Sequence, residues 1–232
     1  MAVQKAEKRK QTLRQPQLLQ EQLQIVTDAE LFLFLSLLET AIYEESSIDG
    51  YWVRGLTLMD VNCSKVTFRN MIFENCRFSV CQFGKAGFRE TVFRNCDLSN
   101  CVFSDSYWDC CTLQDVKGPG MLWTECSLHH LLFEHCQMRY VNFTGTLMEA
   151  VQFQQCSLQE SSISSCKHKQ CQWLECDLTR ADFFRTMLKQ LDFSTCQIDG
   201  ILLSDDYAEL KGLTVNRFQA LELAKLLGIT IQ

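Results

Sequence analysis

Cysteine and histidine are the residues of this chain whose chemistry would matter most if their side chains came together. Fourteen cysteines and four histidines occur in 232 residues. Thiolates and imidazoles are the preferred protein ligands of zinc, and pairs of thiols can form disulfides. The densest group consists of Cys126, His129, His130, His135 and Cys136. Whether these side chains can meet depends on the backbone that carries them.

That backbone is indicated by a period of five residues. From position 66 the sequence reads VTFRNMIFENCRFSVCQFGKAGF, with phenylalanine at every fifth position. Positions that end in 3 or 8, counted from Ile48 to Leu203, give 32 slots, of which 30 are apolar. The 47% apolar content of the chain would give about 15. Neither a helix, with 3.6 residues per turn, nor a strand, with a period of two, produces this pattern.

A coil with flat sides explains the period. The residue two positions before each slot is small or medium-sized, as in Val66, Cys76 and Ala86, and the residue between the two is often polar. Three extended residues therefore point in, out and in, and two further residues turn a corner. Four such units close a coil of 20 residues. The 32 units predict eight coils and a body roughly 38 Å long at ~4.8 Å per coil.

This register decides what the thiols can do. Twelve of the fourteen cysteines fall in the small inward slot, and Cys63 and Cys110 are the exceptions. Thiols in neighbouring coils would lie ~4.8 Å apart with parallel Cβ vectors, whereas a disulfide needs converging Cβ atoms at ~3.8 Å. We therefore expect buried structural thiols. Cys126 and Cys136 point inward while the histidines near them lie at corners, so we expect no metal site.

Two irregular slots interrupt the apolar pattern. Gly118 precedes Pro119 and Gly120, which favours a local kink or small cavity over a recognition bulge. His168 lies between two lysines, which favours a hydrogen-bonded inward ring or a distorted face over catalysis. The sequence contains no GxSxG, P-loop, HExxH or GxGxxG motif. We expect neither enzymatic activity nor a cofactor.

The repeated motifs resemble a known family. Segments such as NCDLSNCVF, CDLTRADF and LDFSTCQI are similar to the units of pentapeptide-repeat proteins. The resemblance implies an all-β fold for 46–204, a right-handed quadrilateral parallel β-helix. The unbroken register resembles the loop-free members of the quinolone-resistance branch.

The N-terminal residues divide into a tail and a cap. Residues 1–15 are basic and predict a disordered tail. Residues 16–45 predict an N-terminal cap or the first β-helix strands. Thr27 and Glu30 form a capping-box pattern that would start a helix. The five-residue register also continues backward, however, and we favour strands for 31–45, with the residues before them covering the open end of the coil.

Residues 205–232 predict a helical cap with a possible role in dimerisation. Asn216 is a candidate N-cap residue, and Gly228 is a candidate C′ glycine. The segment has more apolar side chains than a monomeric cap requires. The candidate dimer contacts are Phe218, Leu221, Leu223, Leu227 and Ile229. The family resemblance implies a homodimer joined tail to tail through this segment.

The outward positions carry mixed charge and one apolar stripe. The region 46–204 has 17 acidic and 14 basic residues, a net charge of −3. DNA carries one charge per ~1.7 Å, so a mimic of this length would need roughly 20 net negative charges. The stripe consists of Trp52, Ile72, Val92 and Leu132. It predicts either a partner surface or a face that the N-terminal segment covers.

These observations predict a non-enzymatic scaffold that acts by protein–protein interaction with an unidentified partner. The family's best-known activity implies an alternative, a DNA-mimic-like binder of DNA gyrase or topoisomerase IV that gives quinolone tolerance. The weak net charge argues against that alternative. The apolar run 31–38 is too short to span a bilayer and lacks the features of a signal peptide. We expect a cytoplasmic protein with no membrane contact and no direct nucleic-acid contact.

Overall fold

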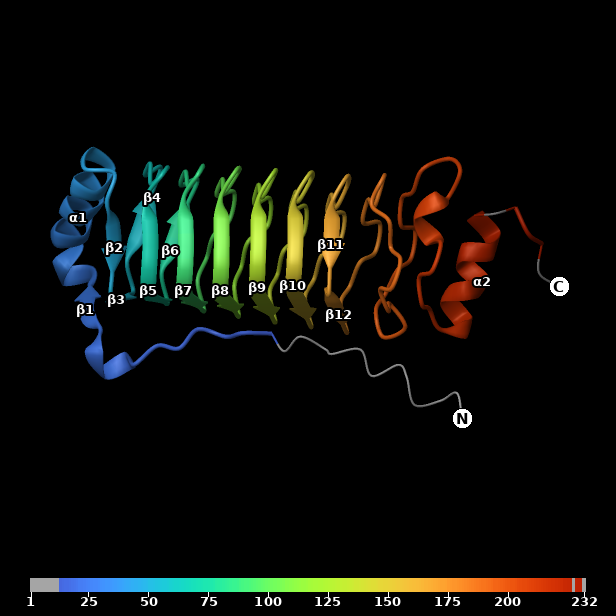
Figure 1. The fold of residues 1–232 in the computed structure, drawn as a ribbon, viewed down its shortest axis with the longest axis horizontal. Coiled ribbons are helices and arrows are strands. Elements are labelled where there is room, and N and C mark those ends of the chain that lie inside the picture. Colours follow the sequence, from blue (N-terminus) through green and yellow to red (C-terminus); the bar gives the residue numbers. More distant parts are fainter. Residues whose placement is uncertain (1–12, 227, 231–232) are drawn as a thin grey trace.

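The computed structural model describes residues 13–226 and 228–230. Its body is a parallel β-solenoid with a helix at each end (Figure 1). In chain order the elements are η1 (Gln20–Gln22), β1 (Gln24–Thr27), η2 (Asp28–Glu30), α1 (Leu31–Tyr43), β2 (Ser47–Asp49), β3 (Tyr51–Arg54), β4 (Thr57–Met59), β5 (Thr67–Glu74), β6 (Arg77–Ser79), β7 (Gly87–Arg94), β8 (Tyr107–Gln114), β9 (Ser127–Glu134), β10 (Leu147–Gln154), β11 (Lys167–Lys169), β12 (Gln172–Leu174), η3 (Ala208–Leu210) and α2 (Arg217–Leu226). The β-solenoid predicted from the repeat is confirmed.

Successive coils pair in register at a spacing of twenty residues. Phe68 of β5 pairs with Phe88 of β7, and Phe133 of β9 pairs with Phe153 of β10. These strands belong to one sheet of ten, which follows the long axis of the molecule. The regular part makes about six turns, somewhat fewer than the eight coils predicted. The first unit is divided among short strands, and the ladder opens after β11.

The corners of the coil share one backbone conformation. Their second residue, at positions ending in 0 or 5, has a positive φ, and the non-glycine examples from Glu45 to Gln190 lie between 46° and 70°. Asparagine, aspartate and glycine tolerate this left-handed region best, which explains why corners such as Asn70 and Gly145 are polar or glycine. Val80, with φ 58°, is a β-branched exception.

Stacked rings fill the interior. The ring centroids of Phe68 and Phe88 lie 5.2 Å apart, and those of Phe133 and Phe153 lie 4.7 Å apart, with interplanar angles of 15° and 3°. The stack continues from Phe153 to Trp173 at 4.1 Å. These distances are close to the spacing of hydrogen-bonded strands, so the ladder itself sets the rings at stacking distance. Each aromatic pair adds ~0.5–1.5 kcal/mol beyond area burial.

All fourteen cysteines are free and buried, so their prediction as core residues is confirmed. The structure adds a role that the small apolar slot did not suggest. The Cys96 thiol lies 3.3 Å from the carbonyl of Phe73 in the preceding coil and donates to it. Thr146 occupies the same slot and donates from its hydroxyl to the carbonyl of Trp123. Cysteine thus combines small size with a weak hydrogen-bond donor.

The prediction of strands for 31–45 is wrong, because α1 occupies most of this range. Phe34 and Leu38 are buried one helical turn apart, and the backbone N–H of Thr27 donates to the Glu30 carboxylate at 2.7 Å in a capping box. The edge that additional strands would need is already occupied, since β1 pairs with β3 along its whole length. The α1 helix therefore closes the open end of the coil.

The C-terminal end is closed by α2 (Figure 1). Asn216 is its N-cap as predicted, because Asn216 Oδ1 accepts from the N–H groups of Phe218 and Gln219 at 2.9 and 3.0 Å. Gly228 has φ 74° and its N–H donates to Lys225, as expected for a C′ glycine. The buried Gln219 side chain donates to two carbonyls of the last coil, at 2.8 and 2.6 Å. Among the described residues, no helix combines the length and apolar character that a membrane crossing requires.

Candidate interaction surfaces

The N-terminal segment, residues 13–23, runs along the outside of the solenoid (Figure 1). The backbone N–H of Arg14 donates to His130 Nδ1 at 3.3 Å, and that of Gln17 donates to Glu90 Oε2 at 2.8 Å. His130 and Glu90 lie two coils apart, or ~10 Å, which is the span of three extended residues. The segment therefore crosses the strands in an extended conformation.

The apolar stripe lies beside this segment. Register stacks its four residues in one row, as predicted. Ile72 is 1% exposed and Leu132 is 7% exposed although both occupy outward positions, while Trp52 and Val92 are half-buried. The segment bonds to the corner residues that immediately precede this face, so it is placed to cover the stripe. A partner role for the stripe stays a prediction that requires the segment to leave.

The start of the segment differs from the expected disordered tail. Residues 13–15 lie against the solenoid, and the Arg14 guanidinium lies 3.3 Å from Asp109 Oδ1. Residues 1–12 of the predicted tail lie outside the described residues. Burial, and then the positive charge of Arg14, lower the pKa of His130. The neutral ring is therefore the form that accepts the Arg14 hydrogen bond at neutral pH.

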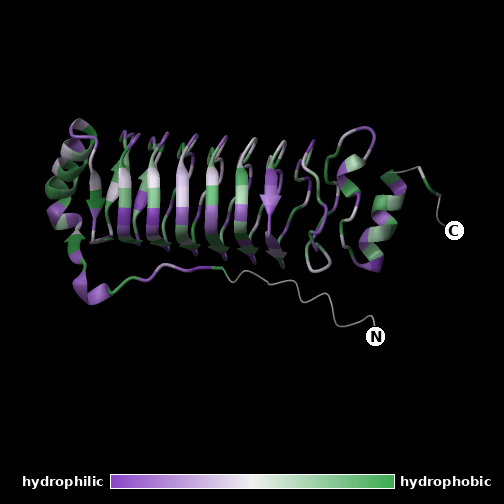
Figure 2. Ribbon diagram, in the orientation of Figure 1, coloured by the Kyte–Doolittle hydropathy of each residue, from purple (hydrophilic) through white to green (hydrophobic). Residues whose placement is uncertain are grey.

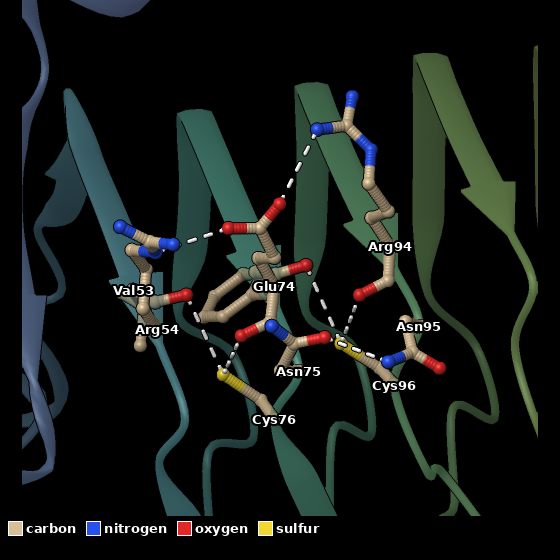
Figure 3. A network of polar contacts seen from close by, with 9 residues as sticks. Val53, Arg54, Glu74, Asn75, Cys76, Arg94, Asn95 and Cys96 are labelled. Carbon is tan, nitrogen blue, oxygen red and sulfur yellow. Dashed lines mark hydrogen bonds and ion pairs between the residues drawn. The ribbon is translucent and has the colours of Figure 1, made fainter.

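Ion pairs across neighbouring coils neutralise carboxylates of the solenoid surface. Figure 3 shows Glu74 between Arg54 and Arg94, which lie 3.0 and 3.5 Å from its carboxylate oxygens. Asn95 donates to Asn75 Oδ1 at 2.7 Å in the same way, one coil to the next. Further cross-coil pairs are Arg77–Asp97, Arg139–Glu160 and Lys169–Glu149. The surface therefore alternates in sign along the solenoid axis and does not reproduce the continuous negative charge of DNA.

The outer surface of the C-terminal cap is apolar in part. Phe218 is 63% exposed, and Leu221 and Ile229 are also exposed. Leu223, another predicted dimer contact, instead packs against the core and so faces the solenoid. Leu227 lies outside the described residues. The remaining three candidates stay available for a dimer contact.

The N-terminal cap has an exposed apolar surface that the sequence reasoning missed. Phe32 is 88% exposed and Tyr43 is 90% exposed, at the two ends of α1. Figure 2 shows hydrophobic residues along much of this helix. Assigning 31–45 to strands had placed half of these side chains inward. The capping box at Thr27 and Glu30 was the signal that could have identified the helix and its outer surface.

The cysteine and histidine group between 126 and 136 does not converge. Cys126 and Cys136 are buried. His129 faces Glu149 with 3.6 Å between Nδ1 and the carboxylate, and His135 Nε2 lies 2.6 Å from Gln155 Oε1. In the described part of the chain, no group of three or more His, Cys, Asp or Glu side chains could hold a metal ion.

Comparisons with known proteins agree with this architecture. A family model described as pentapeptide repeats (8 copies) matches residues 62–100, and one described as a pentapeptide repeat region matches 91–163. The chain carries a pentapeptide-repeat solenoid. No curated protein sequence matches it.

Solved pentapeptide-repeat structures resemble the chain at low sequence identity. A trypsin-treated form of QnrB1, a plasmid-mediated fluoroquinolone resistance protein, is 15% identical, with 81% of this chain and 99% of QnrB1 covered and a TM-score of 0.47. HetL from Nostoc sp. strain PCC 7120, involved in heterocyst differentiation regulation, is 15% identical over 72% and 88% of the two chains, with a TM-score of 0.35. Rfr23 from Cyanothece 51142 is 8% identical over 78% and 99%, with a TM-score of 0.29.

Proposed function

We propose that this pentapeptide-repeat protein is a non-enzymatic scaffold that acts by protein–protein interaction through its two ends. The distribution of exposed apolar side chains carries this proposal. Phe32 and Tyr43 at one end, and Phe218 at the other, leave most of an aromatic ring in solvent. The solenoid between them carries cross-coil ion pairs, with single exposed apolar side chains such as Met59 and Tyr140 among them. Large exposed apolar side chains gathered in one place are typical of contact surfaces.

The C-terminal surface suits a second copy of the same chain. Phe218 and Leu221 lie on α2, and Ile229 follows it, so one self-complementary patch of a twofold dimer could include all three. Aromatic residues near the centre of an interface contribute most of its binding energy. We therefore expect a homodimer in which α2 of each protomer packs on its counterpart.

The test is the molar mass of the full-length chain in solution, measured by light scattering after size exclusion. We expect a dimer mass, and a monomer for the double variant Phe218→Asp with Leu221→Asp, because two buried charges would each cost several kcal/mol. Met59→Asp, at an exposed apolar position on the solenoid, is the matched control and should remain dimeric. A monomeric wild-type chain, or dissociation by Met59→Asp, contradicts the α2 interface. Circular dichroism checks that each variant is folded.

Binding of DNA gyrase or topoisomerase IV is the second candidate function, and the ion pairing at Glu74 makes it the less favoured one. The test is gyrase supercoiling with purified protein, with and without a fluoroquinolone. Inhibition, or protection from drug-induced cleavage, would support this function. No effect up to tens of micromolar would exclude it and leave the end surfaces as the place to search for a partner.

A cytoplasmic location is part of the proposal. All fourteen thiols are free and buried, and twelve of them occupy the repeated inward slot, where the ladder keeps neighbouring thiols parallel. A reducing compartment preserves such thiols, whereas secreted proteins with many cysteines are usually cross-linked. Fractionation of cells that produce the full chain would test the location.

A further inference from the structure

The hydrogen-bond ladder is interrupted between β11 and the next coil. On the preceding side, Lys167 N donates to Thr146 O at 3.1 Å, and on the following side Leu188 N donates to Glu209 O at 3.0 Å. Between them, the N–H groups of His168, Gln170 and Met187 make none of the coil-to-coil bonds that the register calls for. Their equivalents elsewhere do, as in Leu147 N to Cys126 O at 2.8 Å.

A polar residue occupies the apolar slot at this interruption, which also extends to the next side of the coil, where the N–H groups of Trp173 and Asp192 make no coil-to-coil bond. The positions one and two coils earlier, Met148 and Leu128, hold buried apolar side chains, whereas His168 is half-exposed. Its ring lies outside the core, and Nε2 bonds to the carbonyl of Met187 at 2.5 Å. The ring thus takes the acceptor that the His168 backbone N–H would use, and it holds the two coils apart. Met187 itself occupies an outward position and is 46% exposed.

The opening is a solvent-open surface pocket of about 590 Å³ with a basic lining. Lys167, Arg185, Lys189 and the His168 ring contribute to its wall, and no acidic residue does. Among the described residues these two lysines and the arginine take part in no ion pair, whereas Lys169 nearby is paired with Glu149. The carboxylate of Glu209, in the segment that follows, is 1% exposed and accepts from the backbone N–H of Arg185 at 2.8 Å.

We propose that this opening binds a small phosphate ester, with the phosphoryl group held by Lys167, Arg185 and Lys189. An anion placed among three positively charged side chains is attracted to each of them. The unpaired N–H groups of His168 and Met187 belong to residues that line the opening, one from each coil, and supply neutral donors of the kind that cradle oxyanions. A cavity of this volume exceeds a free phosphate ion and falls in the range of small-molecule sites.

The experiment is calorimetric titration of the full-length chain with two probes, inorganic phosphate and ribose 5-phosphate, at constant ionic strength. We expect saturable binding of both, with ribose 5-phosphate the tighter, because the cavity has room for the group that carries the phosphate. No saturable heat with either probe up to ~10 mM would overturn the site. Equal affinity for the two probes would overturn the assignment to an ester and leave a site for the free oxyanion.

Three variants locate the binding. Arg185→Glu and Lys189→Glu should each weaken ribose 5-phosphate binding by about tenfold or more, because each replaces a charged donor by a repelling carboxylate. Lys85→Glu, at an exposed lysine on an intact part of the solenoid, is the matched control and should bind normally. Equal weakening by Lys85→Glu would mean that only net charge matters, and would overturn the site.

His168→Leu tests the opening itself without changing the three cations. Leucine fits the apolar slot, so the two coils should pair and the cavity should close. We expect ribose 5-phosphate binding to fall at least as far as in Lys189→Glu while the protein becomes more stable. Unchanged binding by a folded His168→Leu chain would mean that the opening is not the site.

Discussion

Gly118 and His168 are the two positions where the apolar slot fails, and the solenoid deals with them in opposite ways. At Gly118 the side chain of Met121 fills the empty slot, since a Cβ built on Gly118 would overlap it. The ladder continues there, with Gly118 N donating to Gln137 O at 2.8 Å. At His168 the ring leaves the core and the ladder opens. Missing volume can be replaced by a neighbour, whereas an imidazole without a buried partner must reach solvent or a carbonyl.

Pro119 is tolerated beside Gly118 for a related reason. The corresponding N–H groups of Ser99 and Thr179, in other corners, donate to aspartate side chains and not to the ladder. A proline at this corner position therefore removes no coil-to-coil bond. Neither the kink nor the recognition bulge considered from the sequence is present at 118–120.

Removing the Met121 side chain, which fills the Gly118 slot, should have the largest effect on the free energy of unfolding. Met121→Ala would leave the Gly118 slot empty, and we expect the free energy of unfolding to fall by ~3 kcal/mol, in the range of buried Met→Ala changes. Met187→Ala at the opening, where the side chain is exposed, should cost less than ~0.5 kcal/mol. Urea denaturation followed by circular dichroism measures both. Similar losses for the two variants would refute the packing role of Met121.

Alkaline pH should weaken the core next. Burial raises the pKa of Cys126, under an intact ladder, to about 11 and that of Cys166, at the opening, to about 12, from the ordinary value of 9. Above pH 9 the unfolded chain releases thiol protons that the folded chain keeps. Stability should therefore be complete below pH 9 and fall as pH rises toward these values, by ~1.4 kcal/mol per pH unit for each thiol.

The thiol contribution is isolated by comparing variants between pH 8 and pH 10.5. Cys126→Ala and Cys166→Ala should each lower the free energy of unfolding at pH 8. Above pH 9, each variant should lose stability less steeply, by the contribution of the thiol that it lacks. If Cys166→Ala left the slope unchanged, the opening would already admit water to that thiol, and the two sites would differ more than their burial indicates.

His168→Leu should act in the opposite direction to Met121→Ala. Burying leucine and restoring coil-to-coil hydrogen bonds should raise the free energy of unfolding by ~1–2 kcal/mol. Hydrogen exchange provides a direct readout, since the amides of His168, Gln170 and Met187 should become protected. Gln190, whose N–H already donates to Gly212 O, is the internal control and should change little. A destabilised variant with unchanged exchange would show that the histidine ring supports the fold.

Replacing Val80, the β-branched residue at a corner, should have the smallest effect on stability. Val80 adopts φ 58° with a β-branched side chain that is exposed, so Val80→Asn should stabilise the chain by ~0.5–1 kcal/mol. The reverse change at an equivalent corner, Asn95→Val, should destabilise it by at least that amount, because it also removes the bond to Asn75. Thermal denaturation of the two variants measures the difference. Changes of the same sign would contradict the left-handed corner as the cause.

The sequence predicted many of the residues that form the candidate surfaces but not how other segments cover or open those surfaces. The row from Trp52 to Leu132 follows from period and register, whereas the exposure of Phe218 and Leu221 was expected only from the apolar content of the C-terminal segment. The covering of Ile72 does not, since it depends on where residues 13–23 lie. His168 was recognisable as an exception, yet its consequence needed the position of Met187 in the next coil.

The sequence by itself determined the solenoid, its twenty-residue register and its buried thiols. Each of these follows from local alternation of inward and outward residues repeated without insertion. The capping box at Thr27 and Glu30 allowed a helix for 31–43, and the tertiary structure decided between helix and strand, because β1 pairs with the free edge of β3 and leaves those residues to close the end. The tertiary structure also decided where the ladder opens. Both outcomes are competitions between segments far apart in the chain for the same hydrogen-bonding groups, and a periodic pattern does not record which segment wins.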